Sequence, residues 1–322
     1  MVRRFSEDDV RRVLTMKDAL RAVERAFRDR AAGQAVDTPR ARTRSSLGTL
    51  HILQGAAPAL GVVGFRAFHA RPDRRTDFVV LIDATKGGLL AVVDSYWLGV
   101  MGAGAATGVA TRALARSDST TLGCIGAGPR MVAQIEAVCA VRPIRSVRVF
   151  APHQDRLGAF CKELGERLGE EIVPAPSVAD AVAGADIVNV MTRSSPTPVL
   201  LGAALVPGMH VNAAGVNRLD HRELDLEAVR RADLIVVDSV QTARAESGDL
   251  LGAVEAGLVH WEGLADLGGV LAGQHPGRQS DEQITLFESH GLALQDLYAA
   301  HHVMTASPAA ALPPAPPAPP PR

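Results

Sequence analysis

The stretch that decides the fold is Thr121-Leu122-Gly123-Cys124-Ile125-Gly126-Ala127-Gly128-Pro129-Arg130-Met131. Its apolar first half is typical of a buried strand, and residues 131–141 have a helical pattern. Gly126 permits a tight turn, and Gly128 allows the backbone to approach a pyrophosphate. Pro129 suits the first helical turn, where its missing N–H is not needed. A strand, a Gly-x-Gly turn and a helix start therefore predict a dinucleotide-binding site.

Further apolar runs follow this turn, with helix-like segments between them. The runs are Ser146–Phe150, Ile187–Met191, Met209–Ala213 and Leu234–Asp238. Ser177-Val178-Ala179-Asp180 resembles a capping box and predicts the start of one helix. Buried strands alternating with helices predict an α/β fold, a doubly wound parallel sheet of the Rossmann type. An α/β domain without a cofactor is the alternative, because Met131 stands where a third glycine is usual.

The first third of the chain has a different pattern. Residues 7–33 predict two amphipathic helices, and residues 104–114, rich in Gly and Ala, predict a tightly packed one. Strand-like runs lie between them, at Thr49–Leu53, Val62–Phe68, Phe78–Ile82 and Leu89–Val93. Asp83-Ala84-Thr85-Lys86-Gly87-Gly88 predicts a hairpin turn between the last two runs. We therefore expect a second, mixed α+β domain.

Composition limits the function classes. A chain of 322 residues with 47% apolar residues is long enough for two domains with cores of their own. The formal net charge of −1 gives no basic excess for a nucleic-acid partner. The N-terminus has no apolar signal segment, and the nearly uncharged stretch 95–111 is too short to cross a bilayer. We expect a cytoplasmic protein with no membrane partner.

The cysteines and the C-terminus suggest no further site. Cys124, Cys139 and Cys161 lack metal-ligand spacing, so we expect reduced thiols and no metal. Residues 307–322 are almost entirely Pro and Ala, which predicts a disordered or polyproline tail.

Motifs along nearly the whole chain resemble the ornithine cyclodeaminase/μ-crystallin family. Besides the glycine turn they are Thr38-Pro39-Arg40, Gly64-Phe65-Arg66, Gly104–Thr111, Asn212–Asn217, Arg222-Glu223-Leu224, Glu246–Leu250 and Gln283–Ala293. The resemblance implies binding of NAD(H) or NADP(H) and hydride transfer at a carbon–nitrogen bond. It also implies a homodimer, a discontinuous substrate and dimerisation domain (residues 1–116 and 292–306) and a dinucleotide domain (residues 117–291).

The departures from the family bear on the substrate. In the cyclodeaminases two arginines and a lysine hold the substrate carboxylate; here Arg40 matches the first arginine and Arg66 replaces the lysine. Arg66 keeps the charge but cannot serve as a base. Gly102 stands in place of the second arginine, and Asn217 in place of the catalytic aspartate. Asn217 can hydrogen-bond a substrate nitrogen but cannot accept a proton.

Two histidines are candidate proton donors, and each has a purely structural alternative. His51 matches an acidic residue of the cyclodeaminases, and His290 replaces a small apolar residue beside the nicotinamide. The candidate catalytic residues are therefore His51, Arg66, Asn217 and His290, with Arg40 and Arg66 binding an anionic group of a small substrate. The candidate cofactor residues are Gly126, Gly128, Pro129, Arg130, Met131, His153, Arg156, Thr192, Asn217 and Ser289. Thr192, by resemblance, contacts the nicotinamide ribose.

The second strand of the dinucleotide domain bears on cofactor choice. It ends at Phe150-Ala151-Pro152, where an NAD-selective enzyme usually has an acidic residue for the ribose 2′-hydroxyl. Ala151 does not repel a 2′-phosphate, and His153 and Arg156 are nearby cations. The sequence therefore favours NADP(H) over NAD(H).

These observations favour an NAD(P)H-dependent oxidoreductase that reduces a C=N bond or oxidatively deaminates an amine, of the imine or ketimine reductase or amino-acid dehydrogenase type. One alternative is a cyclodeaminase acting on ornithine or lysine. Another is a crystallin-like protein that binds NADP without turnover, which Gly102 and Asn217 favour.

Overall fold

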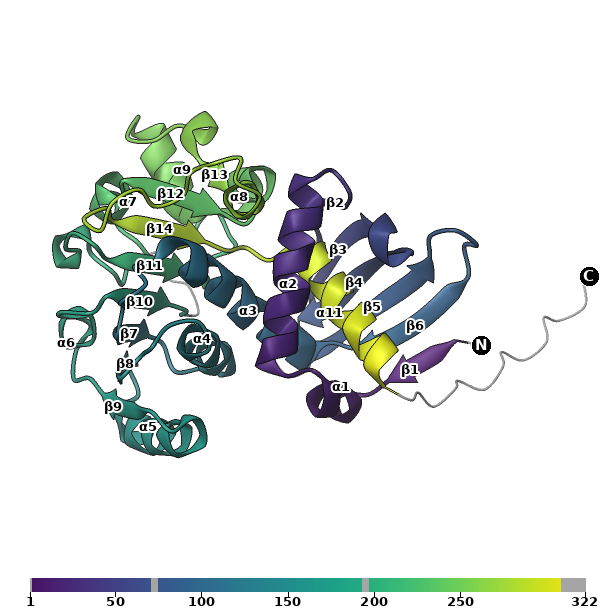
Figure 1. The fold of residues 1–322 in the computed structure, drawn as a ribbon, viewed down its shortest axis with the longest axis horizontal. Helices are drawn as coiled ribbons and strands as arrows, with labels where there is room; N and C mark the ends of the chain where they lie inside the picture. The colour runs from purple at the N-terminus through teal and green to yellow at the C-terminus, as the bar shows by residue number, and fades with distance from the viewer. Residues whose placement is uncertain (1, 71–74, 193–196, 308–322) are drawn as a thin grey trace, which may run out of the picture.

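The computed structural model describes residues 2–70, 75–192 and 197–307. Its strands form two sheets at opposite ends of the molecule, with helices between them (Figure 1). The predicted tail lies outside the described residues from residue 308 onward. Ser307 is described and buried, and its carbonyl accepts a hydrogen bond of 2.6 Å from Arg3.

The larger sheet has eight strands in the order β13-β12-β14-β11-β10-β7-β8-β9, and all its pairs are parallel. The strands are β7 (Thr121–Ile125), β8 (Ser146–Phe150), β9 (Glu171–Pro174), β10 (Ile187–Val190), β11 (His210–Ala213), β12 (Leu234–Val237), β13 (Ala265–Asp266) and β14 (Thr285–Glu288). The predicted doubly wound parallel sheet is confirmed. After β9 the chain crosses to the other side of β7, so the topological switch point lies between β7 and β10.

Short helices connect these strands. They are α4 (Pro129–Cys139), α5 (Gln154–Leu168), α6 (Val178–Val182), α7 (Leu226–Arg231), α8 (Val240–Glu246), α9 (Gly248–Glu255) and α10 (Leu267–Leu271). The predicted cap at α6 is present, since the side chain of Ser177 accepts a hydrogen bond from the backbone of Asp180. The helix after the glycine turn begins two residues earlier than predicted, at Pro129.

The smaller sheet has the order β1-β6-β5-β4-β3-β2 and is antiparallel except for the pair β1–β6. Its strands are β1 (Arg3–Phe5), β2 (Val36–Ser45), β3 (Gly48–Ala57), β4 (Val62–Ala70), β5 (Arg75–Asp83) and β6 (Leu89–Asp94). The predicted hairpin joins β5 and β6, where the backbone N–H of Asp83 donates to the carbonyl of Gly88. The sequence did not indicate β1, which is very short, or β2, which is rich in arginine.

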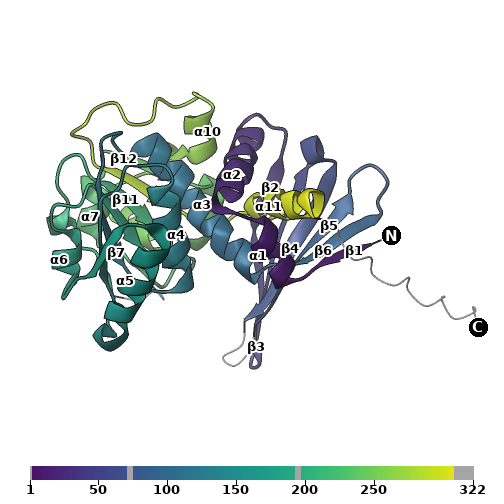
Figure 2. The same cartoon turned by 60° about the horizontal axis from the view of Figure 1, so that its bottom comes forward.

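Four helices lie against this sheet or between the sheets: α1 (Glu7–Val13), α2 (Met16–Ala31), α3 (Tyr96–Leu114) and α11 (Ala293–Ala306). Figure 2 shows α11, in yellow, lying along the smaller sheet although it follows β14 of the larger one. Gly64 lies under this helix, and a Cβ there would lie 2.2 Å from the carbonyl oxygen of Val80 on β5 and 3.0 Å from Cδ2 of Leu297 on α11. Likewise α3 packs closely on α4, because a Cβ on Gly104 would lie 2.6 Å from the carbonyl oxygen of Ala133. The domain limits drawn from sequence stay a prediction.

Among the helices of the described residues, none is both long and apolar enough to span a membrane.

Candidate active site

Glycine is required for different reasons at two positions of the turn after β7. Gly126 has a φ of +119°, and a Cβ on it would lie 2.2 Å from the carbonyl oxygen of Met191 at the end of β10. The fold itself therefore requires Gly126. Gly128 caps α4 with an ordinary φ of −91°, and a Cβ there would meet no described atom within 4 Å. Gly128 thus leaves open space at the start of α4, as a pyrophosphate cradle needs.

The first turn of α4 fits this purpose, with one correction to the predicted residues. Pro129 occupies the first helical turn, and no side chain caps the helix, so its first N–H groups remain available to an anion. Arg130 is half-buried beside them. The side chain of Met131 is fully buried in the hydrophobic core. Met131 can therefore offer a cofactor its backbone alone.

The end of β8 has the features expected for cofactor discrimination. Ala151 is buried, and both His153 and Arg156 are exposed at the start of α5. Arg156 is paired only loosely, since its Nε lies 3.8 Å from Asp155 and the Arg156 side chain is 90% exposed. This position therefore has an exposed arginine, paired with the exposed Asp155, and no acidic residue directly after the strand.

Thr192 is held by a residue to which sequence reasoning gave no role. Its N–H and its Oγ1 both donate to Oε1 of the buried Glu223, each at 2.6 Å. The other carboxylate oxygen accepts from the N–H of Gly215 at 2.8 Å. Burial raises the pKa of Glu223. Glu223 therefore ties together the segments that follow β10 and β11, and its only signal in the sequence was its place in a family motif.

Ser289 and His290 follow β14 and bind Asp238, which follows β12. Oδ2 of Asp238 accepts from the Oγ of Ser289 at 3.2 Å and from the N–H of His290 at 2.7 Å. The imidazole lies 3.4 Å from Oδ1 of Asp238 and 3.5 Å from Oε2 of Glu288. Burial alone would lower the pKa of His290, but these two carboxylates raise it to about 10. Its side chain is 2% exposed and lies between two carboxylates, an arrangement that favours the structural alternative for His290 over the role of proton donor.

Three other predicted residues meet around Phe68. The ring of His51 stacks on Phe68 with a centroid distance of 4.4 Å. The guanidinium carbons of Arg66 and Arg40 lie 5.3 Å and 5.9 Å from the centre of the same ring. Strands β2, β3 and β4 thus bring Arg40, His51 and Arg66 together, at the side of the smaller sheet where α11 begins.

The guanidinium of Arg66 is held by hydrogen bonds to two aspartates. It donates to both oxygens of Asp77, at 2.8 Å and 2.7 Å, and to Asp296 at 3.0 Å. Burial alone would lower the pKa of Arg66, but the two aspartates outweigh burial and raise it. Because two carboxylates already pair with this cation, the geometry favours a structural role for Arg66 over binding of a substrate anion.

Arg40 is less fully engaged. Its Nη2 donates to the carbonyl of His290 at 2.7 Å, and its Nη1 lies 3.8 Å from Oε2 of Glu246, too far for a hydrogen bond. Its Nε is buried and has no hydrogen-bond partner among the described residues. Burial lowers the pKa of Arg40 to about 10. A buried arginine with an unused donor is suited to bind an anion.

Asn217 and Gly102 lie near this group. The carbonyl of Asn217 accepts from Nη2 of Arg42 at 2.8 Å, and Arg42 also pairs with Glu246. Gly102 is buried on α3, yet a Cβ there would meet only Cβ of Gln295, at 4.0 Å. A small side chain would therefore fit at Gly102 without a clash with α11.

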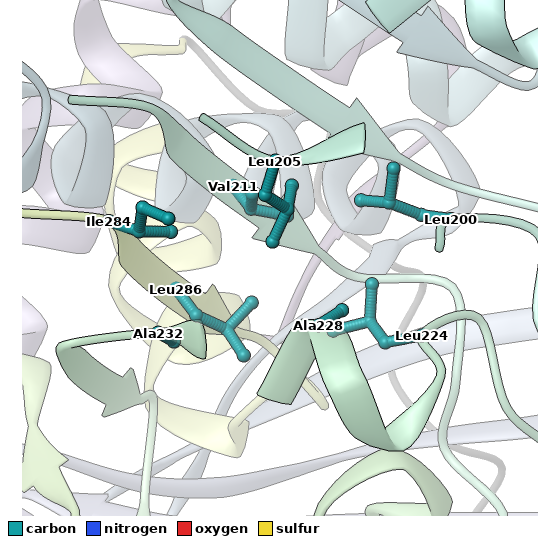
Figure 3. A pocket seen from close by; sticks show the side chains of 8 residues that line it. All are labelled: Leu200, Leu205, Val211, Leu224, Ala228, Ala232, Ile284 and Leu286. Carbon is teal, nitrogen blue, oxygen red and sulfur yellow. The ribbon is translucent and has the colours of Figure 1, made fainter. Parts of the chain in front are cut away.

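Two other kinds of site find no support. Figure 3 shows a small gap whose walls are apolar side chains of β11, β14, α7 and the loops beside them. With no polar group to orient a ligand, it is part of the core. Among the described residues, no group of three or more His, Cys, Asp and Glu side chains could hold a metal ion.

The comparisons with known proteins agree with this geometry. The model of the ornithine cyclodeaminase/mu-crystallin family matches residues 3–308. The chain belongs to the ornithine cyclodeaminase/mu-crystallin family.

Relatives in this family cover almost the whole chain. It is 31% identical over 313 residues to a Delta(1)-pyrroline-2-carboxylate reductase of Bacillus cereus, covering 93% of this chain and 94% of the relative. The structure of the Thermococcus litoralis Delta(1)-pyrroline-2-carboxylate reductase with NADH and L-proline superposes with a TM-score of 0.90, at 31% identity over 94% of this chain and 96% of that one. The structure of an archaeal alanine dehydrogenase dimer with bound NAD superposes with a TM-score of 0.88, at 30% identity over 94% of this chain and 95% of that one.

These matches settle the class of protein. The predicted family is confirmed, and so is the predicted NAD(P)-dependent oxidoreductase acting at a carbon–nitrogen bond. Binding of a nicotinamide dinucleotide and of a small-molecule substrate is supported at this level.

Proposed function

We propose that this protein is an NAD(P)H-dependent imine reductase whose substrate carries a carboxylate, and that Arg40 binds this carboxylate. One observation supports this most strongly: Arg40 is buried beside the start of α11 and keeps an unused Nε donor. A cyclic imine with an adjacent carboxylate, such as Δ1-pyrroline-2-carboxylate, has the required chemistry. The similar reductase from Thermococcus litoralis binds L-proline, which is the corresponding amine.

Each of the site residues has a separate role in the proposed reaction. The open turn at Gly128 and the N-terminus of α4 hold the pyrophosphate, and the reduced nicotinamide, when bound, supplies the hydride. Glu223 fixes the segments after β10 and β11, and thereby Thr192. Arg40 orients the carboxylate, Asn217 hydrogen-bonds the imine nitrogen, and His51 donates the proton, because His290 is enclosed in ion pairs.

Steady-state kinetics test this function. Arg40→Met should raise the KM for Δ1-pyrroline-2-carboxylate about tenfold or more, since a charge-assisted hydrogen bond contributes about 1.5–3 kcal/mol. The matched control is Arg44→Met, an exposed arginine on the same strand. An unchanged KM in Arg40→Met would overturn the role of Arg40. No oxidation of NADH or NADPH with any cyclic imino acid would overturn the function.

Two finer proposals accompany this function. We infer a preference for NADP(H), with His153 and Arg156 facing the 2′-phosphate. We also propose a homodimer formed through the face of the smaller sheet opposite α11. That face carries a group of half-buried apolar side chains, with the exposed Gln54 among them: Ile52, Val63, Phe65, Val80, Ile82 and Val92. Analytical ultracentrifugation of Phe65→Glu tests this, and a dimer that persists in this variant would contradict it.

A further inference from the structure

On the basis of the substrate role proposed for Arg40, we propose that Arg42 is a positioning residue that keeps Arg40 available to the substrate. It does so by holding the carboxylate of Glu246, whose Oε2 already lies within ion-pair distance of Arg40 and would otherwise move into hydrogen-bond contact with it. Arg42 would thereby set how strongly the enzyme prefers anionic substrates.

The geometry of the three side chains supports this role. Glu246 is the last residue of α8, is fully buried, and faces two arginines of β2. Nη1 of Arg42 donates to its Oε1 at 3.2 Å, and Nη2 lies 3.0 Å from its Oε2. Nη1 of Arg40 is further away, 3.8 Å from the same Oε2. The closer pair is therefore the one with Arg42, and it crosses from the smaller sheet to the dinucleotide half of the chain.

The electrostatic consequence follows from burial. A carboxylate with no exposure to water needs a cation or a proton close by. If Arg42 is removed, the nearest remaining cation is Arg40, which needs to move less than 1 Å to reach hydrogen-bond distance. Its guanidinium would then be neutralised by Glu246 and would attract a substrate carboxylate less strongly.

Arg42 has a second contact, and its effect must be distinguished from that of the pair with Glu246. Its Nη2 donates to the backbone carbonyl of Asn217 at 2.8 Å, so removing Arg42 also releases the segment that carries Asn217. Replacing Glu246 by glutamine removes the competing charge without restoring that contact. A double variant therefore separates charge competition from loss of the Asn217 contact.

The experiment compares Arg42→Met, Glu246→Gln, the double variant and Arg44→Met as control. Each full-length variant is assayed with Δ1-pyrroline-2-carboxylate at saturating cofactor, and L-proline binding to the NADH complex is measured by calorimetry. We expect Arg42→Met to raise KM and the L-proline Kd roughly tenfold, as for loss of one charge-assisted hydrogen bond, with NADH affinity unchanged. Adding Glu246→Gln should return both to within about threefold of the parent value, and Arg44→Met should change neither.

The outcomes that overturn the proposal are distinct from those that overturn the function. If the double variant is as impaired as Arg42→Met, competition by Glu246 is excluded. If Arg40→Met leaves KM unchanged, the function proposed above fails instead. Thermal unfolding shows whether Arg42→Met folds; if it does not, the neutral Arg42→Gln replaces it, and the same rescue by Glu246→Gln is required. A rise in KM in Glu246→Gln alone would also contradict the proposal.

Discussion

Gly99 leaves the space that the guanidinium of Arg66 occupies. A Cβ on Gly99, in the first turn of α3, would lie 2.2 Å from Nη1 and 2.3 Å from Nη2 of Arg66. The guanidinium of Arg66 on β4 can therefore lie against α3 only because residue 99 has no side chain. In this position Arg66 forms ion pairs with Asp77 on β5 and with Asp296 on α11, and so connects these two elements.

Gly99→Ala should therefore be destabilising, although alanine is the better helix former. Displacing Arg66 would strain its buried ion pairs, and we expect a loss on the order of 3 kcal/mol in the free energy of unfolding. Urea denaturation measures this. Gly158→Ala, at an exposed position inside α5 with open space around it, is the control and should gain about 0.5–1 kcal/mol. Equal stability of the Gly99 variant and the parent would contradict the argument.

The two glycines of the turn should respond differently to substitution. Gly126→Ala should destabilise the protein without any ligand, because its Cβ would collide with the carbonyl of Met191. Gly128→Val should leave the midpoint of thermal unfolding unchanged and weaken binding of NADPH and NADH at least about tenfold, or about 1.4 kcal/mol. Cofactor fluorescence and differential scanning calorimetry separate the two effects. Full cofactor affinity in Gly128→Val would place the pyrophosphate elsewhere.

The parts of the fold that depend on residues close together in the sequence could be predicted. The strand, turn and helix around Gly126 and the capping of α6 by Ser177 depend on near neighbours, and both are present. Strand β2 was not predicted, because its arginines resemble a solvated surface until Glu246 is placed beside Arg40 and Arg42. Contacts between segments far apart in the chain produce no periodic pattern of apolar residues from which a single sequence could predict them.

The same limit applies to the site, where the partners of the predicted residues could not be found from the sequence. Arg66 matched a substrate-binding lysine by position, but its partner Asp296 is 230 residues away in the chain. His290 was recognised as a titratable group, and its partner Asp238 was known only as the end of a strand. The family resemblance located these residues, and the charges around them, which the resemblance does not specify, determine what they can do.

The stability of the protein should fall as the pH rises above neutrality, in part because of His290. Its pKa is raised from 6.5 in the unfolded chain to about 10 in the folded one. The resulting stabilisation is complete below about pH 6.5 and is lost as the pH rises through 10, at up to about 1.4 kcal/mol per pH unit. His290→Gln should therefore flatten the decline between pH 7 and pH 9.5. An identical slope in the parent and the variant, by urea denaturation at both pH values, would contradict a protonated His290.

Cofactor discrimination should depend on Arg156. An exposed ion pair contributes up to about 1 kcal/mol, so Arg156→Met should weaken NADPH binding by roughly fivefold and leave NADH binding unchanged. The loss should shrink at high salt, because exposed charges are screened. The control is Arg167→Met, at the other end of α5. Tighter binding of NADH than of NADPH by the parent protein would contradict the proposed preference.

Ornithine should be a poor substrate. Cyclodeamination needs a firm grip on the α-carboxylate and a base near the reacting amine. Arg66 is paired with two aspartates, Gly102 offers no cation, and Asn217 cannot accept a proton. Loss of a general base commonly costs about 100-fold or more in rate, so we expect a turnover below about 0.1 per second against an enzyme median of about 10. Proline formation from ornithine, with NAD⁺ and NADP⁺ each supplied, measures this. A turnover near the median would show that another residue acts as the base, and His51, stacked on Phe68 beside Arg40, would be the first to replace.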